Sequence, residues 1–221
     1  GSTIEGAGQI GINDSSFAFT LTNKGTIDAN QSNPLQIAPS GAVTNEGTFE
    51  VAEGSTLEVI GDSHGLVQKQ GASGTPLTQV DGSLEVPNGF QLGAGLLKGT
   101  GTVIGNVNNT GGAVAPGDSP GVLTIQGDYT QAADGAFDVF LAGLAPGTEY
   151  TQLDVTDSAS LGGQIDVTKA ASFKLALDDT FTVLVFGSLT GDLTSFDYNG
   201  AAAQTSGIAR AACSSQRRSY P

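Results

Sequence analysis

The only histidine of the chain, His64, follows directly after Asp62 and Ser63. An aspartate, a serine and a histidine are the residue types of a hydrolytic triad. Neighbouring residues in an extended segment point to opposite sides, so Ser63 and His64 would need a turn to meet. Asp62, Ser63 and His64 are the candidate catalytic residues if the chain is a hydrolase. The simpler interpretation is a solvated loop tip, and no catalytic residue is assigned with preference over it.

Three further aspartates follow an apolar residue and precede a valine: Asp138, Asp154 and Asp166. If their strands stack, their carboxylates form an acidic ladder, and calcium suits such hard oxygen ligands. Solvated alternating positions are the simpler interpretation. No other cofactor is expected, because the glycine pairs at Gly99–Gly101 and Gly111–Gly112 lack the Lys-Ser/Thr sequence of a phosphate loop.

A glycan hydrolase needs two carboxylates across a substrate groove. Asp178 and Asp179 are the only adjacent acidic pair, and they precede a strand at a place where a turn is expected. Polysaccharide lyases commonly set a basic residue beside acidic ones, yet no arginine precedes Arg210. These patterns favour a structural role for the acidic residues over a catalytic one.

The elements that would position these residues are short strands. The stretch Leu97–Gln131 has β-branched runs with period-two apolar residues, separated every few positions by Gly, Asn, Asp or Pro. This pattern is typical of strands and excludes ordinary helices. We therefore expect an all-β chain.

Internal repeats indicate how the strands are arranged. Leu21–Ile27 matches Val43–Phe49, and Glu53–Val59 matches Asp81–Val86. The Asn-x-Gly of the first pair supplies a corner that tolerates positive φ. The apolar-Asp-Val pattern recurs at Phe137, Leu153 and Ile165, and Tyr129-Thr130-Gln131 recurs as Tyr150-Thr151-Gln152. Such repeats predict a right-handed parallel β-helix over residues 1–200, with laps of roughly 20 to 22 residues. Leu21 should stack on Val43, and Phe137 on Leu153.

Two segments are expected to leave the coil as loops, at 33–41 with its two prolines and at 61–76. The strand Phe181–Phe186 is apolar on both faces at its end and should be covered by another segment. Residues 201–221 are expected to form an irregular tail that is not native to the fold. All three arginines and the only cysteine, Cys213, lie in this tail. Gly1-Ser2 has the appearance of a cloning scar, so the missing signal peptide carries little information.

Composition limits the partners. Eight Lys and Arg against 22 Asp and Glu give a formal net charge of −14. Such a chain repels phosphate backbones and anionic membrane surfaces. A single cysteine excludes an internal disulfide, and no apolar run has the length of a membrane span. The acidity fits a soluble protein outside the cell.

Three motifs carry a family resemblance: Gly99-Thr100-Gly101-Thr102-Val103, Val114–Gly121 and Gly127-Asp128-Tyr129-Thr130-Gln131. In their order they resemble the closing passenger segment of autotransporter-type β-helix proteins, including those with autotransporter-associated β-strand repeats, from Leu97 to about Asn199. The resemblance implies a right-handed parallel β-helix, secretion by a Gram-negative-type bacterium and display at its surface. It also implies a C-terminal membrane barrel or anchor in the full protein.

The expected function is thus a secreted or cell-surface structural or adhesive module. Its expected partners are a host or matrix surface, a glycan or a protein, and not a nucleic acid. The alternatives are a hydrolase or polysaccharide-active enzyme on the same scaffold, and a folding support for a neighbouring part of the protein.

Overall fold

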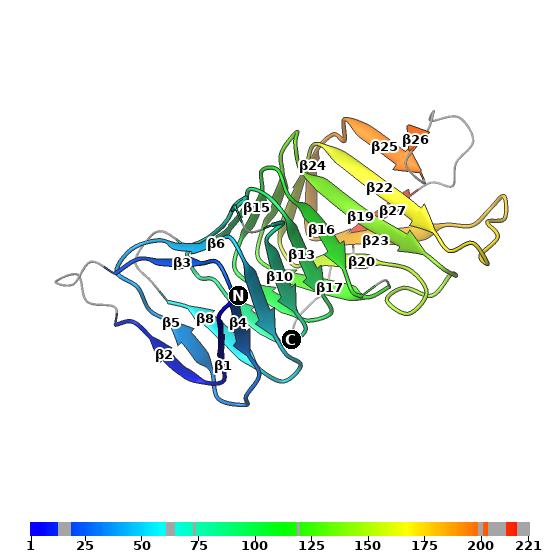
Figure 1. Ribbon diagram of the computed structural model, residues 1–221. Coiled ribbons are helices and arrows are strands. Elements are labelled where there is room, and N and C mark those ends of the chain that lie inside the picture. Colours follow the sequence, from blue (N-terminus) through cyan, green and yellow to red (C-terminus); the bar gives the residue numbers. More distant parts are fainter. Residues whose placement is uncertain are drawn as a thin grey trace, which may run out of the picture.

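The computed structural model describes residues 1–12, 19–60, 65–72, 74–118, 120–198, 201–202 and 211–215, the last two ranges as backbone only. Within these ranges the chain contains strands and turns and no helix. From Thr3 to Tyr198 the strands form three parallel sheets that the chain visits in strict rotation, which is the topology of a parallel β-helix (Figure 1). The predicted fold class is therefore confirmed.

The first sheet, called sheet A here, has ten strands. In spatial order they are β1 (Thr3–Glu5), β4 (Thr26–Ala29), β7 (Thr48–Val51), β10 (Leu77–Val80), β13 (Leu96–Gly99), β16 (Ala113–Pro116), β19 (Ala136–Leu141), β22 (Gln164–Lys169), β25 (Ser195–Tyr198) and β26 (Ala201–Ala202). All pairings are parallel except that of β25 with β26.

The second sheet, sheet B, has nine strands: β2 (Gly8–Ile10), β5 (Leu35–Ile37), β8 (Thr56–Val59), β11 (Ser83–Glu85), β14 (Thr102–Ile104), β17 (Val122–Gln126), β20 (Gln152–Val155), β23 (Phe181–Phe186) and β27 (Ala211–Ser215). The third, sheet C, has eight: β3 (Leu21–Asn23), β6 (Val43–Asn45), β9 (Leu66–Gln68), β12 (Phe90–Leu92), β15 (Val107–Asn109), β18 (Tyr129–Gln131), β21 (Ser158–Leu161) and β24 (Ser188–Gly191).

Alternation of side chains builds the core. In β19, Phe137, Val139 and Leu141 are buried while Asp138 and Phe140 keep part of their surface in solvent. The same period-two pattern recurs on each sheet, so inward residues of successive laps lie over one another at about 4.8 Å, the spacing of strands in a sheet. The coil therefore has one continuous apolar interior and three outward faces.

The repeat-based predictions have mixed outcomes. Leu21 pairs in register with Val43, as predicted, and Leu57 pairs with Leu84. Phe137, however, pairs with Ile165 on sheet A, whereas Leu153 lies on sheet B opposite Leu123. The stacking of Phe137 on Leu153 was wrong, because the apolar-Asp-Val pattern occurs on two different sheets of the same lap.

The tyrosine recurrence is also not a lap repeat. Tyr129 lies in β18 and pairs with Ala159, whereas Tyr150 lies outside the strands, in the connection between β19 and β20. The spacing of 21 between the two tyrosines is shorter than the local lap, since 30 positions separate Tyr129 from Ala159 (159 − 129 = 30).

Both predicted loop insertions contain strands of the coil. Residues 33–41 include β5, whose Leu35 and Ile37 are buried and pair with β2 and β8. The two prolines, Pro34 and Pro39, flank this strand and interrupt no ladder within it. Residues 61–76 include β9. Of the residues described there, Gly65, 69–72 and 74–76 lie outside the three sheets, and 61–64 and 73 are not described.

The expectation for the strand Phe181–Phe186 is met by β27, which pairs with β23 on sheet B. Phe181, Val183, Leu184 and Phe186 are all buried. Within the segment 201–221, expected as an irregular tail, β26 and β27 are strands, and the other residues lie outside the described ranges. The described residues include no helix of the length and hydrophobicity needed to cross a membrane.

Candidate functional site

Two long connections between strands lie at one corner of the coil, between sheets A and B. Residues 142–151 join β19 to β20, and residues 170–180 join β22 to β23 on the next lap. We call these two connections the corner loops. They leave the coil toward its C-terminal end, on the right of Figure 1. Neither loop was predicted from the sequence, although the turn at Asp178-Asp179 was expected.

The first corner loop is braced by its own backbone and by Glu149. The Glu149 carboxylate accepts hydrogen bonds from the backbone N–H groups of Leu144 and Ala145 at 2.9 and 3.0 Å. The Ala142 N–H donates to the Glu149 carbonyl at 2.7 Å. The Leu144 side chain, 53% exposed, is thus held outward on a fixed turn.

The second corner loop ends in a similar turn. Asp179 accepts a hydrogen bond from the Ala176 N–H at 2.7 Å, and the Asp179 N–H donates back to the Ala176 carbonyl at 3.3 Å. This reciprocal pair holds Leu177 at the tip with 93% of its surface exposed. Asp179 therefore closes a turn, as the sequence suggested for the Asp178-Asp179 pair.

An aromatic cluster anchors both loops to the core. The Tyr150 and Phe181 rings meet edge to face with centroids 5.4 Å apart, and Phe173 meets Phe181 in the same way at 6.2 Å. The Thr182 N–H donates to the Tyr150 hydroxyl at 3.3 Å. Because one ring comes from each loop and the third from β23, the two loops share a single aromatic base that packs against the core.

The aspartates predicted as a ladder separate into two groups. Asp138 of β19 pairs in register with Asp166 of β22, which pairs with Asp197 of β25. Asp154 lies on sheet B, opposite Thr124 and Val185. The ladder of Asp138, Asp154 and Asp166 was therefore wrong as a set of three, because Asp154 belongs to another face.

The Asp138 carboxyl has an unusual proton affinity. Burial, together with the negative charge of Asp166 on the next strand, raises the pKa of Asp138 to about 6. The Asp166 carboxylate accepts a hydrogen bond from the Gln164 amide at 2.8 Å. No group of three or more His, Cys, Asp or Glu side chains is suitably placed for a metal ion within the described ranges. Calcium binding at Asp138 and Asp166 stays a prediction.

The hydrolase candidates Asp62, Ser63 and His64 lie outside the described residues. The neighbouring β9 is part of sheet C, so this segment belongs to the connection between β8 and β9. Whether the three side chains meet stays a prediction as well.

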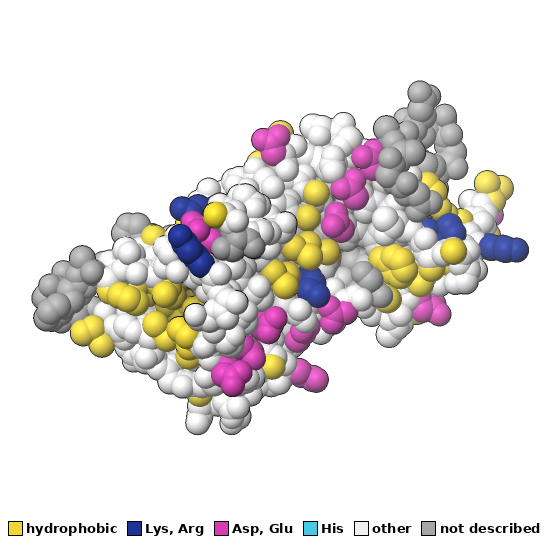
Figure 2. Space-filling view, in the orientation of Figure 1, with side chains coloured by type: hydrophobic (Ala, Val, Ile, Leu, Met, Phe, Trp, Pro, Cys, Tyr) yellow, Lys and Arg dark blue, Asp and Glu magenta, His cyan; other side chains and the backbone are white. Residues whose placement is uncertain are grey.

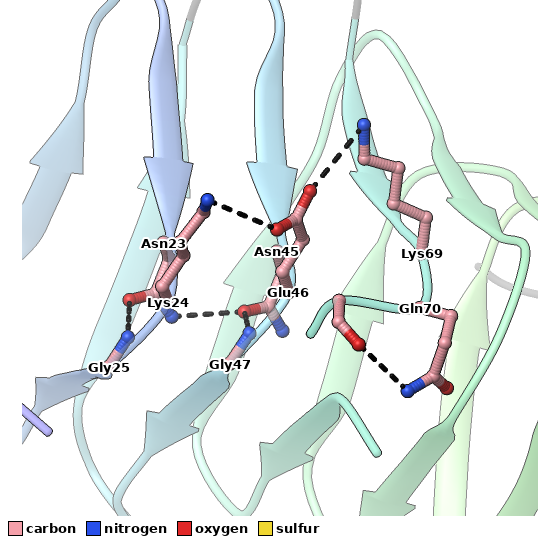
Figure 3. A network of polar contacts seen from close by, with 9 residues as sticks. Asn23, Lys24, Gly25, Asn45, Glu46, Gly47, Lys69 and Gln70 are labelled. Atoms are coloured by element: carbon pink, nitrogen blue, oxygen red, sulfur yellow. Dashed lines mark hydrogen bonds and ion pairs between the residues drawn. The ribbon is translucent and has the colours of Figure 1, made fainter. Parts of the chain in front are cut away.

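Sequence reasoning missed a column of buried amides at the corner between sheets C and A (Figure 3). The Asn23 amide N–H₂ donates to Asn45 Oδ1 at 2.9 Å, and the Asn45 amide donates to Gln68 Oε1 at 3.1 Å. Asn45 and Gln68 are fully buried. These amides also bind backbone groups of their own corner, as in the hydrogen bond from the Gly47 N–H to Asn45 Oδ1 at 3.1 Å, and of the next lap, as in the one from the Asn45 amide to the Leu77 carbonyl at 2.9 Å. The column is a structural support of the coil.

The corners at Gly25 and Gly47, where the Asn-x-Gly pattern tolerates a positive φ, form without one. Neither glycine has a φ in the left-handed range. A Cβ on Gly47 would lie 2.3 Å from the carbonyl oxygen of Gly25, so glycine is required because adjacent corners approach closely. Above this corner, Glu46 forms ion pairs with Lys24 at 3.8 Å and Lys69 at 3.6 Å (Figure 3).

Comparisons with models of known protein families, with curated proteins and with solved structures found no match.

Proposed function

We propose that the chain is a structural and adhesive module of a secreted or surface-displayed protein. The coil supplies a stiff rod, because every lap is hydrogen-bonded to the laps on either side and adds to one continuous core. The formal net charge of −14 suits a protein that stays soluble outside the cell. The resemblance to autotransporter passenger segments supports the same setting.

The observation that carries the proposal is the pair of corner loops. Large apolar side chains held outward on braced turns are suited to contacts with a partner. Leu144 and Leu177 stand on turns that Glu149 and Asp179 close with hydrogen bonds, so little conformational freedom is lost on binding. Partners for these loops are a host or matrix surface, a glycan or a protein.

An attachment assay tests this function. Beads coated with the whole chain are counted on surfaces of purified matrix proteins and glycans. The proposal expects retention on at least one surface, and loss of retention with the double substitution Leu144→Ser and Leu177→Ser. Thr22→Ser and Thr130→Ser on sheet C are the matched controls and should retain attachment. No retention on any surface, or equal retention by the loop variant, would contradict the proposal.

A second candidate function is glycan hydrolysis, favoured by one observation. Asp138 and Asp166 stand on adjacent strands in register, and the pKa of Asp138 is raised to about 6. A carboxylic acid that keeps its proton near neutral pH beside an ionised carboxylate is the pairing that retaining glycosidases use, with carboxyl groups about 5 Å apart. In this role Asp138 would be the general acid and Asp166 the nucleophile.

An assay for cleavage of neutral and acidic polysaccharides tests this second candidate function. If it holds, reducing ends accumulate with the unaltered chain, and Asp138→Asn abolishes their release while Asp154→Asn does not. A His64→Ala substitution in the same assay separates this pair from the residues Asp62, Ser63 and His64. Activity that is absent throughout, or unaffected by Asp138→Asn, would exclude Asp138 as the acid.

A further inference from the structure

The outward face of sheet A carries an ordered charge pattern along the axis of the coil. Glu5, Asp28 and Glu50 pair in register on β1, β4 and β7. Near the other end of the same sheet, Asp138, Asp166 and Asp197 pair in register on β19, β22 and β25. We call these sets the first and second carboxylate triads. Each triad places three acidic side chains on neighbouring strands of one face.

This arrangement costs stability, since like charges directly opposite on neighbouring strands repel. The described ion pairs do not relieve it, because they join Lys24 and Lys69 to Glu46, and Lys98 to Asp118. Within the triads, Asp28 accepts a hydrogen bond from Asn30 at 3.0 Å and Asp166 accepts one from Gln164 at 2.8 Å. Such neutral donors leave the summed negative charge in place.

Between the triads, Glu50 pairs in register with Gln79 and Gln79 with Lys98, and the neighbouring outward row of the same face is apolar. Leu77, Leu96, Ala113 and Ala136 pair in register on β10, β13, β16 and β19, and each keeps part of its side chain in solvent. Beside this row, Lys98 is held by Asp118 at 2.9 Å. Figure 2 views this face and shows hydrophobic side chains with one cationic group near the centre, and acidic side chains to either side.

We propose that this face docks an extended segment of another protein that carries basic side chains on both sides of an apolar stretch. Charge complementarity selects this partner, because each triad offers three carboxylates to a cationic cluster while the leucines and alanines offer an apolar contact. The segment lies along the coil axis and crosses the strands of sheet A.

The strand spacing sets the length of that segment. Glu50 on β7 and Asp138 on β19 are the facing ends of the two triads, and four strand steps separate them through β10, β13 and β16. At about 4.8 Å a step this is about 19 Å, which an extended chain spans with about six residues. The partner therefore has two basic clusters separated by about six apolar or neutral residues.

The inference rests on the proposed function only in taking the module to bind another protein. It names a different surface from the corner loops, so the two can fail separately. Attachment that survives while no segment binds sheet A would overturn this inference and leave the proposed function in place. Binding of a segment to sheet A without attachment would support this inference and contradict the proposed function.

A synthetic peptide tests the inference on the whole chain. The probe has a cluster of lysines, six alternating leucine and serine residues, and a second cluster of lysines, with binding followed by fluorescence anisotropy. We expect saturable binding that weakens about tenfold with Asp28→Asn or with Asp166→Asn, as for the loss of one charge-assisted contact. Leu96→Ser should weaken binding without a change in charge. Glu85→Gln, which removes one carboxylate from the outward side of β11 on sheet B, is the matched control and should bind the probe normally.

Three results would overturn the inference. The first is equal weakening by Glu85→Gln and Asp166→Asn, which would indicate attraction to the net charge alone. The second is equal affinity for a peptide of the same composition with all its lysines in one block. The third is displacement of the probe by calcium chloride and not by sodium chloride at the same ionic strength, which would assign the second triad to a metal ion.

Discussion

Asp138 of β19 lies in register with Asp166 of β22, so two carboxyl groups occupy neighbouring strands of one face. The register of the two strands holds the carboxyl groups close together, and this proximity changes the pKa of Asp138. Repulsion from Asp166 adds to the effect of burial and raises the pKa of Asp138 from 3.8 to about 6.

This pair predicts a pH-dependent stability. The folded chain binds a proton at Asp138 more tightly than the unfolded chain, so the free energy of unfolding falls as the pH rises from about 4 through about 6. Asp138→Asn should remove the penalty and stabilise the chain at pH above 6 by about 1 kcal/mol, a value reduced for solvent screening. Denaturant unfolding of both proteins across this pH range measures it, with Asp154→Asn as control. Parallel curves for the unaltered chain and Asp138→Asn would refute the coupling.

The buried amides predict a large contrast between two adjacent asparagines. Asn109 is fully buried, accepts hydrogen bonds from the Gly111 and Gly112 N–H groups and donates to the Ala136 carbonyl. Asn108, on the outward side of the same strand, is exposed. Asn109→Ala should lower the free energy of unfolding by about 3 kcal/mol, since several buried polar groups lose their partner. Asn108→Ala should change it by less than about 0.5 kcal/mol.

Chemical denaturation of the two alanine variants compares these positions directly. Equal losses at Asn108 and Asn109 would mean that the buried Asn109 amide does not support its corner.

The aromatic base of the corner loops predicts a third contrast. Phe181 is buried between Tyr150 and Phe173, so Phe181→Ala should cost about 3 to 5 kcal/mol and open residues 170–180 to protease. Leu177→Ala, at a side chain 93% exposed, should leave both stability and cleavage unchanged. Thermal unfolding and limited proteolysis measure the two effects. Faster cleavage in Leu177→Ala than in Phe181→Ala would refute the anchoring role.

Much of the coil could be predicted where laps carry no insertion. The repeat at a spacing of 22 residues corresponds to one lap of the coil, because Leu21, Thr22 and Asn23 pair one to one with Val43, Thr44 and Asn45. The prediction failed at Phe137 because the first corner loop lengthens its lap. Phe137 and Ile165 are 28 positions apart (165 − 137 = 28), and the closer Leu153 belongs to another sheet.

The candidate site was less predictable because each of its sequence patterns fits two structural interpretations. Asn23, Asn45 and Gln68 occupy inward positions of their strands, which the alternation of apolar residues around them indicates. The sequence interpretation gave more weight to the turn propensity of these segments than to this alternation. The corner loops were missed because their turn-forming residues, Gly143 and Gly147 in 142–151 and Asp178 and Asp179 in 170–180, are of the same types as those of the short turns. The carboxylate triads depend on register between distant segments, which local pattern does not define.

In the coil, outward residues of successive laps form straight columns, and spin-label distances test this arrangement most directly. Cys213→Ser removes the single cysteine, and pairs of new cysteines are placed on the outward column of sheet C at Thr44 and Thr130, Thr22 and Thr130, and Thr22 and Ser160. Pulsed electron resonance should give distances of about 19, 24 and 29 Å, one strand spacing more for each added lap. Distances that do not rise by this step in that order would contradict the coil and every face described on it.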